Sequence, residues 1–154
     1  MNKASERLTF KPNPSLKDLE ILVGEWDTMG LHPMIPFPVL GHASFEWLEE
    51  GAYFVWRYRF ERSMPPSGFA IVGRDDAGAN YCMLYYDERG VSRVYQMSLE
   101  GKIWKLWRES PGFWQHMTGT ISADLNVITV HGEKSSDGSH WEQNAGNLAA
   151  LESN

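Results

Sequence analysis

The side chains best suited to bind a small molecule in this sequence are arginines, tyrosines and a histidine set among aromatic rings. Segment 91–99 alternates in character, and its more apolar face carries Arg93 and Tyr95. An arginine on such a face needs a partner, because burying an unpaired charge is unfavourable. Three explanations stay open for Arg93: an ion pair with a carboxylate such as Glu46, contact with a ligand anion, or exposure at the surface.

Segment 53–61 carries a second arginine, and both of its faces are rich in rings. One face holds Arg57 and Arg59, and the other holds Trp56 with three further aromatic side chains. If the aromatic face points inward, the two arginines are solvated surface charges. If the arginines point inward, they form an anion site that holds a carboxylate with paired donors. The alternation does not decide between these, so Arg57 is a candidate ligand contact.

Two further segments add aromatic and imidazole groups. His116 shares one face of segment 114–120 with Trp114, and Trp104 begins one face of segment 103–108. His116 is the best candidate for a histidine inside the fold, although a histidine satisfied in the core or at the surface is the alternative. The predicted ligand-binding set is Arg57, Arg93, Tyr95, Trp56, Trp104, Trp114 and His116.

Recognisable catalytic and metal-binding motifs are missing from the sequence. It has no glycine-rich phosphate loop and no Gly-x-Ser-x-Gly turn, and its five histidines are scattered without metal-ligand spacing. The single Cys82 cannot form an intramolecular disulfide. These absences leave the catalytic residues unknown and predict no metal.

Charge and hydropathy exclude two classes of partner. The formal net charge is −6 and no basic cluster is longer than a pair, which argues against nucleic-acid binding. No apolar stretch approaches the ~18 residues of a membrane span, and residues 1–10 lack the apolar core of a signal peptide. We therefore expect a cytoplasmic protein.

The candidate residues must be positioned by strands, because most of the chain alternates with a period of two. Roughly ten short alternating segments are separated by turn signals such as Glu50-Gly51, Arg89-Gly90 and Glu100-Gly101. A meander of this length curls into a barrel, which removes its edge strands. The sequence predicts an all-β fold, a single antiparallel up-and-down β-barrel of about ten strands. The expected strands are 26–31, 42–48, 53–61, 69–74, 81–86, 91–99, 103–108, 114–120, 127–132 and 140–143.

A short helix is expected before the barrel. Ser15 is the predicted N-cap with Asp18 three residues on, apolar residues follow at helical spacing, and Gly24 ends the helix. The predicted organisation is a flexible segment 1–14, a barrel domain 15–143 and a tail 144–154. For the tail, continuation of the last strand, a short helix and disorder stay open, with disorder of the final residues favoured.

Three stretches carry a resemblance to known barrels. Gly24-Glu25-Trp26 resembles the Gly-x-Trp signature of calycin barrels such as lipocalins and fatty-acid-binding proteins. Together with Phe45-Glu46-Trp47-Leu48 and residues 84–90, the opening is similar to bacterial proteins of the DUF1579 type, a family without an assigned activity. It also resembles the haem-binding nitrobindins. The resemblance implies a barrel with Trp26 across one end, and the nitrobindin likeness implies haem on a histidine near the C-terminal strand, for which His131 and His140 lie nearest.

The aromatic content bears most directly on function. The chain contains 7 Trp, 6 Tyr and 7 Phe, more than the closure of one core requires. We predict that the barrel binds a small apolar or amphipathic molecule in an aromatic-lined cavity. The alternatives are a haem-binding, nitrobindin-like protein, an isomerase, cyclase or hydrolase that uses Tyr95, Arg93 and His116, and a filled domain that acts through its surface, for example as a homodimer.

Overall fold

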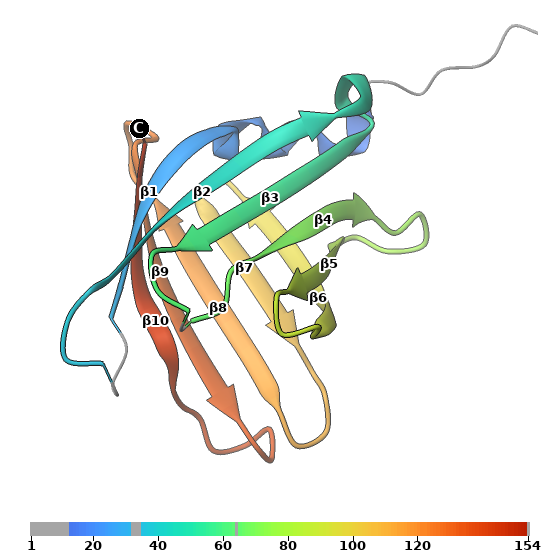
Figure 1. Cartoon of the computed structure of the whole chain (residues 1–154). Coiled ribbons are helices and arrows are strands. Elements are labelled where there is room, and N and C mark those ends of the chain that lie inside the picture. The colour runs from blue at the N-terminus through green and yellow to red at the C-terminus, as the bar shows by residue number, and fades with distance from the viewer. Residues whose placement is uncertain (1–12, 32–34, 64, 154) are drawn as a thin grey trace, which may run out of the picture.

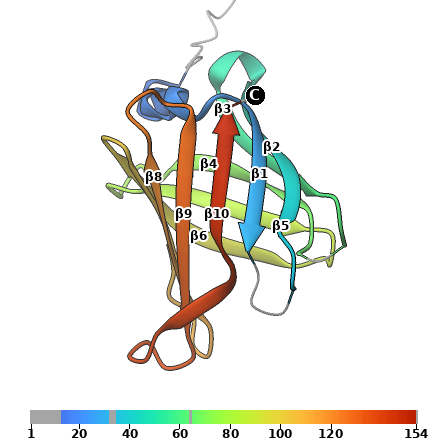
Figure 2. The ribbon, with the colours of Figure 1, turned by 90° about the vertical axis from the view of Figure 1, so that its left-hand side faces the viewer.

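Ten antiparallel strands form a closed barrel in the computed structural model, which describes residues 13–31, 35–63 and 65–153 (Figure 1). Each strand pairs with its neighbours along the chain, and β1 pairs with β10 to close the ring (Figure 2). The predicted up-and-down barrel is therefore confirmed. The strands are β1 Gly24–Leu31, β2 Val39–Leu48, β3 Tyr53–Phe60, β4 Gly68–Arg74, β5 Tyr81–Asp87, β6 Ser92–Glu100, β7 Ile103–Arg108, β8 Trp114–Ile121, β9 Val127–Ser135 and β10 Glu142–Ser153.

The N-terminal helix is a 3-10 helix, η1, which spans Pro14–Leu22. Its buried residues Leu16, Leu19 and Leu22 are three apart, which matches the three residues per turn of this helix. The N-cap is Asn13 and not the expected Ser15, because Pro14 suits the first helical position and starts the helix earlier. The Asn13 side chain accepts hydrogen bonds from the Ser15 backbone N–H at 3.0 Å and from its hydroxyl at 2.7 Å.

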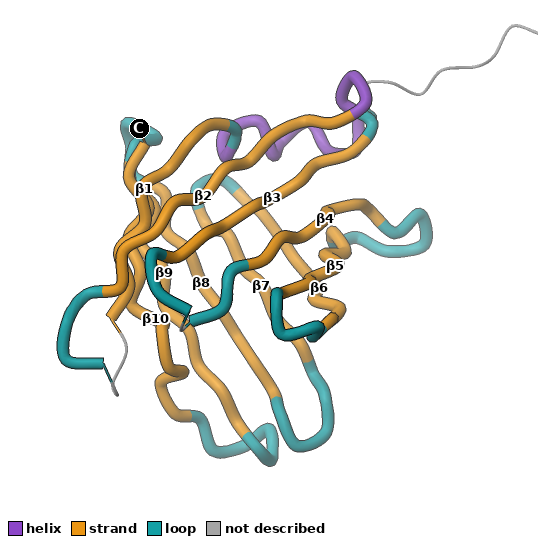
Figure 3. Tube along the Cα trace, in the orientation of Figure 1, coloured by secondary structure: helices purple, strands orange, loops and turns teal. Residues whose placement is uncertain are grey.

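One end of the barrel is closed by η1 and Trp26. The helix lies across this end, and the helical segments in the tube view gather there while loops join the strands at both ends (Figures 1 and 3). The Trp26 side chain is buried, and its Nε1 donates a hydrogen bond to the Leu22 carbonyl at 2.9 Å. None of the helices in the described ranges has the length and apolar character needed to cross a bilayer.

The C-terminal tail continues the last strand, so the barrel extends beyond residue 143. β10 pairs with β1 from Leu31↔Leu148 to Trp26↔Ser153, and this pairing closes the barrel. Its pairing with β9 shifts register between Gln143 and Leu148, which interrupts the alternation that sequence analysis depends on. Residues 1–12 of the expected flexible segment lie outside the described residues.

The half of the interior next to η1 is filled. Phe45 stacks on Trp56 with 5.4 Å between ring centroids and meets Trp104 edge to face at 5.7 Å. Phe54 lies 6.0 Å from Phe45. These rings pack with the three leucines of η1 and with Trp26 in one continuous core, so the closed end offers no room for a ligand.

Candidate functional site

A cavity of about 270 Å³ lies inside the barrel, at the end opposite η1. The inward-facing residues of β3, β5, β6, β7 and β8 line it, and their character changes with depth. Nearest the core the lining is apolar, next come neutral polar groups, and at the mouth two arginines lie beside apolar residues. The residues nearest the core are Trp56, Met83, Leu106 and Met117; those of the polar level are Tyr58, Tyr85, Tyr95 and Gln115; and those at the mouth are Arg89, Arg93, Phe60, Pro65 and Pro66.

Beside the polar level, in contact with Tyr85, lies a buried carboxylate that is fully paired. The Asp87 side chain is completely buried and accepts hydrogen bonds from Arg89 Nη2 and from the Tyr85 hydroxyl, each at 2.7 Å. Arg89 Nε donates to the second oxygen at 3.2 Å. The hydrogen bonds from Arg89 hold the pKa of Asp87 well below its ordinary value. Asp87 therefore stays charged and orients Tyr85.

Two of the tyrosines that border the cavity, Tyr58 and Tyr85, are neutral at physiological pH. Burial raises the pKa values of Tyr58 and Tyr85 above the ordinary value of a phenol. Their hydroxyl groups accordingly act as hydrogen-bonding groups and are poor bases near neutral pH. Tyr95 lies across the cavity wall, where its hydroxyl donates to Gln115 Oε1 at 2.6 Å.

Arg93 and Tyr95 border the cavity together, as expected for the more apolar face of their segment. The Arg93 guanidinium lies over the ring of Phe113, 5.2 Å from its centroid. Glu46, a candidate partner for Arg93, forms an ion pair with Arg57 instead. The ion pair proposed for Arg93 is therefore not found among the described residues. Contact with a ligand anion and exposure at the surface remain as explanations for Arg93.

Arg57 lies outside the barrel. On β3 the aromatic face with Trp56 and Tyr58 points inward, so Arg57 and Arg59 are exposed on the other side. Of the two alternatives for these arginines, solvated surface charges are therefore found, and the internal anion site at Arg57 is not. The physical reason is that four rings on one face of β3 pack against the core, whereas the guanidinium groups keep their hydration outside.

His116 and Trp114 have their rings on the outer side of β8. Gln115 and Met117 point inward, because Met117 pairs with Leu106 of the interior face. His116 borders the cavity wall, but its imidazole stacks on Trp141 with 4.0 Å between ring centroids. Trp114 packs over Gly138, where an added Cβ would lie 3.0 Å from the indole. The sequence did not reveal this orientation, because the inward face of β8 carries the polar Gln115 while the aromatic residues lie on the outer face.

Trp104 lies beneath the cavity and not in its wall. It is 1% exposed, and its ring contacts Phe45 and Trp56. The indole Nε1 atoms of Trp104 and Trp56 have no hydrogen-bond partner among the described residues, although both atoms are buried. Trp56 lines the cavity, but its Nε1 is buried and is not exposed there.

Several residues of the site were not predicted. Tyr58, Tyr85, Arg89 and Gln115 come from four different strands or turns, and only the barrel brings them together. Tyr58 could have been predicted, because it alternates with Arg57 and Arg59 along β3 and therefore shares the inward face of that strand. Nothing in the local sequence marked Gln115, because its side chain is polar and its neighbours are rings.

The two histidines nearest the C-terminal strand lie away from the cavity. His140 has a side chain that is 91% exposed beside Asp137, and His131 is exposed on β9. His42 pairs with Glu25 outside the barrel. His32 lies outside the described residues, and within those residues no cluster of three metal-ligating side chains occurs. Neither His131 nor His140 lines the cavity, and the nitrobindin likeness stays a prediction.

Comparison with known proteins returned no match: no protein-family model fits the chain, and no curated protein matches its sequence. The likeness to calycin barrels and to the DUF1579 type therefore stays a prediction that depends on Gly24-Glu25-Trp26 and the two further stretches.

Proposed function

We propose that this protein binds a small amphipathic molecule in the cavity at the open end of its barrel. The observation that carries the proposal is the lining of the cavity, which is apolar at the floor, carries neutral hydroxyl groups above it, and has two arginines beside Phe60 and two prolines at the mouth. Such a lining matches a ligand with an apolar body and a polar or anionic head, because each part then leaves water for a partner of its own kind. A calycin-like ancestry, suggested by Gly24-Glu25-Trp26, is part of this proposal.

The volume limits the size of the ligand. An apolar cavity of about 150 Å³ holds a benzene molecule, and drug-sized ligands occupy about 300–1,000 Å³. The 270 Å³ of this cavity therefore suits a body of one or two rings or a short chain. Trp56 at the floor supplies a flat surface for an aromatic body.

The protonation states favour binding over acid–base chemistry. Tyr58 and Tyr85 have raised pKa values and Asp87 has a lowered one, so all three keep one protonation state near neutral pH. A general acid or base works best when its pKa lies near the working pH. The isomerase, cyclase and hydrolase alternatives therefore gain no support from these groups.

Titration with 8-anilinonaphthalene-1-sulfonate, whose fluorescence rises in apolar sites, tests the proposal. The wild-type protein should enhance the fluorescence saturably, at one site per chain. Met117→Trp fills the cavity from the inner face of β8 and should abolish the enhancement. Thr120→Trp adds the same ring on the exposed face of the same strand and should leave it unchanged.

Equal loss in both variants, or no enhancement in the wild type, would contradict cavity binding. Native mass spectrometry of freshly purified protein provides an independent readout, because a retained ligand adds a discrete mass that Met117→Trp should remove.

A further inference from the structure

β6 and β7 separate as they approach the open end of the barrel. Their pairing extends from Glu100↔Ile103 to Gln96↔Trp107 and no further. β6 continues to Ser92 without a β7 partner, while Arg108 pairs on its other side with Gln115 of β8. The wall therefore has a split between the first part of β6 and the end of β7.

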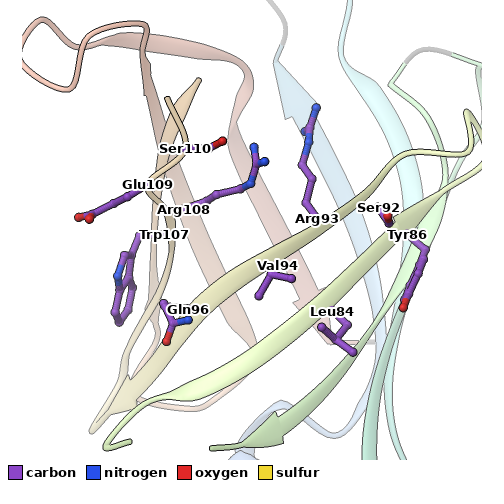
Figure 4. A pocket seen from close by; sticks show the side chains of 10 residues that line it. All are labelled: Leu84, Tyr86, Ser92, Arg93, Val94, Gln96, Trp107, Arg108, Glu109 and Ser110. Atoms are coloured by element: carbon purple, nitrogen blue, oxygen red, sulfur yellow. The ribbon is translucent and has the colours of Figure 1, made fainter. Parts of the chain in front are cut away.

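A groove of about 560 Å³ lies over this split on the outer surface (Figure 4). Arg93 borders both this groove and the internal cavity. The Arg93 side chain is therefore shared by the two hollows.

Two arginines flank the split. Arg93 on β6 and Arg108 on β7 both lie on the inward faces of their strands, because the residues next to them face outward. In Figure 4 the side chains of Arg108 and Ser110 extend toward the side on which Arg93 lies, whereas those of Glu109 and Trp107 extend the other way. Both arginines line the groove. The strands thus bring two guanidinium groups to one groove, which Glu109 also lines from the side opposite to Arg108.

No ion pair formed by the described residues involves either arginine. The contact of Arg93 with the Phe113 ring leaves its charge unneutralised. Two like charges at one groove repel each other, in a protein whose formal net charge is −6. An anion between them removes this repulsion and accepts paired N–H donors from each guanidinium.

We propose that Arg93 and Arg108 together bind the carboxylate of the ligand, with the head group in the split and the apolar body in the cavity. The placement of the ligand's apolar body in the cavity rests on the function proposed above. A planar carboxylate matches the fork of donors on a guanidinium group, and the hydroxyl of Ser110 at the same groove supplies a further donor. The ligand is accordingly a small organic acid with one or two rings or a short chain, and Arg108 determines specificity for the acid.

Calorimetric titration with two probes of equal shape tests this assignment. Naphthalene-2-carboxylate carries the charge, and naphthalene-2-carboxamide replaces it with a neutral group. Wild-type protein should bind the carboxylate more tightly. Arg93→Gln and Arg108→Gln should each weaken carboxylate binding by roughly tenfold or more, the loss expected for a hydrogen bond to a charged group. Carboxamide binding should change little.

Arg59→Gln is the matched control, because Arg59 is exposed on the outer face of β3 and its loss changes the net charge equally. It should leave both affinities unchanged. Arg93→Lys and Arg108→Lys keep the charge and should keep part of the preference for the carboxylate, which preserves the test if a glutamine variant does not fold.

The two proposals fail in different ways. If neither probe binds the wild-type protein, the cavity does not bind such molecules. If both probes bind the wild type with equal affinity, or if Arg108→Gln weakens both equally, cavity binding stands and the carboxylate assignment is overturned.

Discussion

Trp104 and Trp56 meet edge to face inside the barrel, with 5.2 Å between ring centroids and 69° between ring planes. This contact divides the interior into two halves. Trp104 belongs to the filled core beside η1, whereas Trp56 forms part of the cavity floor. A barrel of this size therefore obtains both stability and a binding site by filling only one end.

Replacing Trp104 should strongly destabilise the protein. Trp104→Ala removes a fully buried indole and should lower the free energy of unfolding by about 3–5 kcal/mol, because the surrounding rings cannot close the cavity left behind. Trp107→Ala removes the same side chain from the outer face of β7 and should cost about 1 kcal/mol or less. Urea unfolding measures both. Similar losses would mean that Trp104 is not part of the core.

Asp87 should make stability depend on pH in the acid range. Asp87→Asn weakens the charged hydrogen bonds from Arg89 and Tyr85 and should cost about 1.5–3 kcal/mol at neutral pH. The pKa of Asp87 is lower in the folded protein than the value of about 3.9 expected in the unfolded chain. Its contribution is therefore complete above that value and is lost as the pH falls toward the folded-state pKa.

The difference in unfolding free energy between wild type and Asp87→Asn should accordingly be constant from about pH 7 to pH 5 and shrink below about pH 4. Urea unfolding across this range measures it. A difference that stays the same at low pH would show that the carboxylate charge does not matter.

His42 should titrate above the ordinary pKa of histidine. The hydrogen bond with Glu25 raises the pKa of His42, and Asp27 adds to this through a contact of 3.4 Å. A raised pKa means that the protonated ring stabilises the fold below about pH 6.5 and that this contribution is lost as the pH rises through the folded-state pKa.

Nuclear magnetic resonance titration of the His42 ring measures its pKa directly. Glu25→Gln should bring the pKa of His42 down toward the ordinary value. A pKa of His42 that does not change in this variant would rule out the pairing.

Gly68 should not tolerate a side chain, whereas Gly73 on the same strand should. An added Cβ at Gly68 would lie 2.3 Å from the Tyr86 carbonyl oxygen and 2.9 Å from the Tyr58 hydroxyl. Gly68→Ala should therefore cost roughly 1–3 kcal/mol and displace Tyr58 at the cavity. At Gly73 nothing lies within 4 Å, so Gly73→Ala should be neutral or slightly stabilising. Thermal unfolding distinguishes them; equal effects would contradict the close contacts at Gly68.

The sequence by itself determined the number, order and approximate limits of the strands. Turn signals and period-two alternation are local properties, so segments such as 53–61 and 103–108 were placed to within a residue or so. It also placed Arg93 and Tyr95 on the inward face of β6, because apolar neighbours mark that face. Of the final strand only the beginning was predicted, at 140–143, since the register shift between Gln143 and Leu148 breaks the alternation.

Only the tertiary structure decided which side of the aromatic strands faces inward and how much of the interior is filled. On β8 the inward residues are Gln115 and Met117 while Trp114 and His116 lie outside, the reverse of what hydropathy favours. The orientation of a strand follows from its register with its neighbours. On β8 this register places Met117 opposite Leu106 of β7. Register couples all ten strands of a closed barrel, so no single segment carries enough information to determine its own inward face.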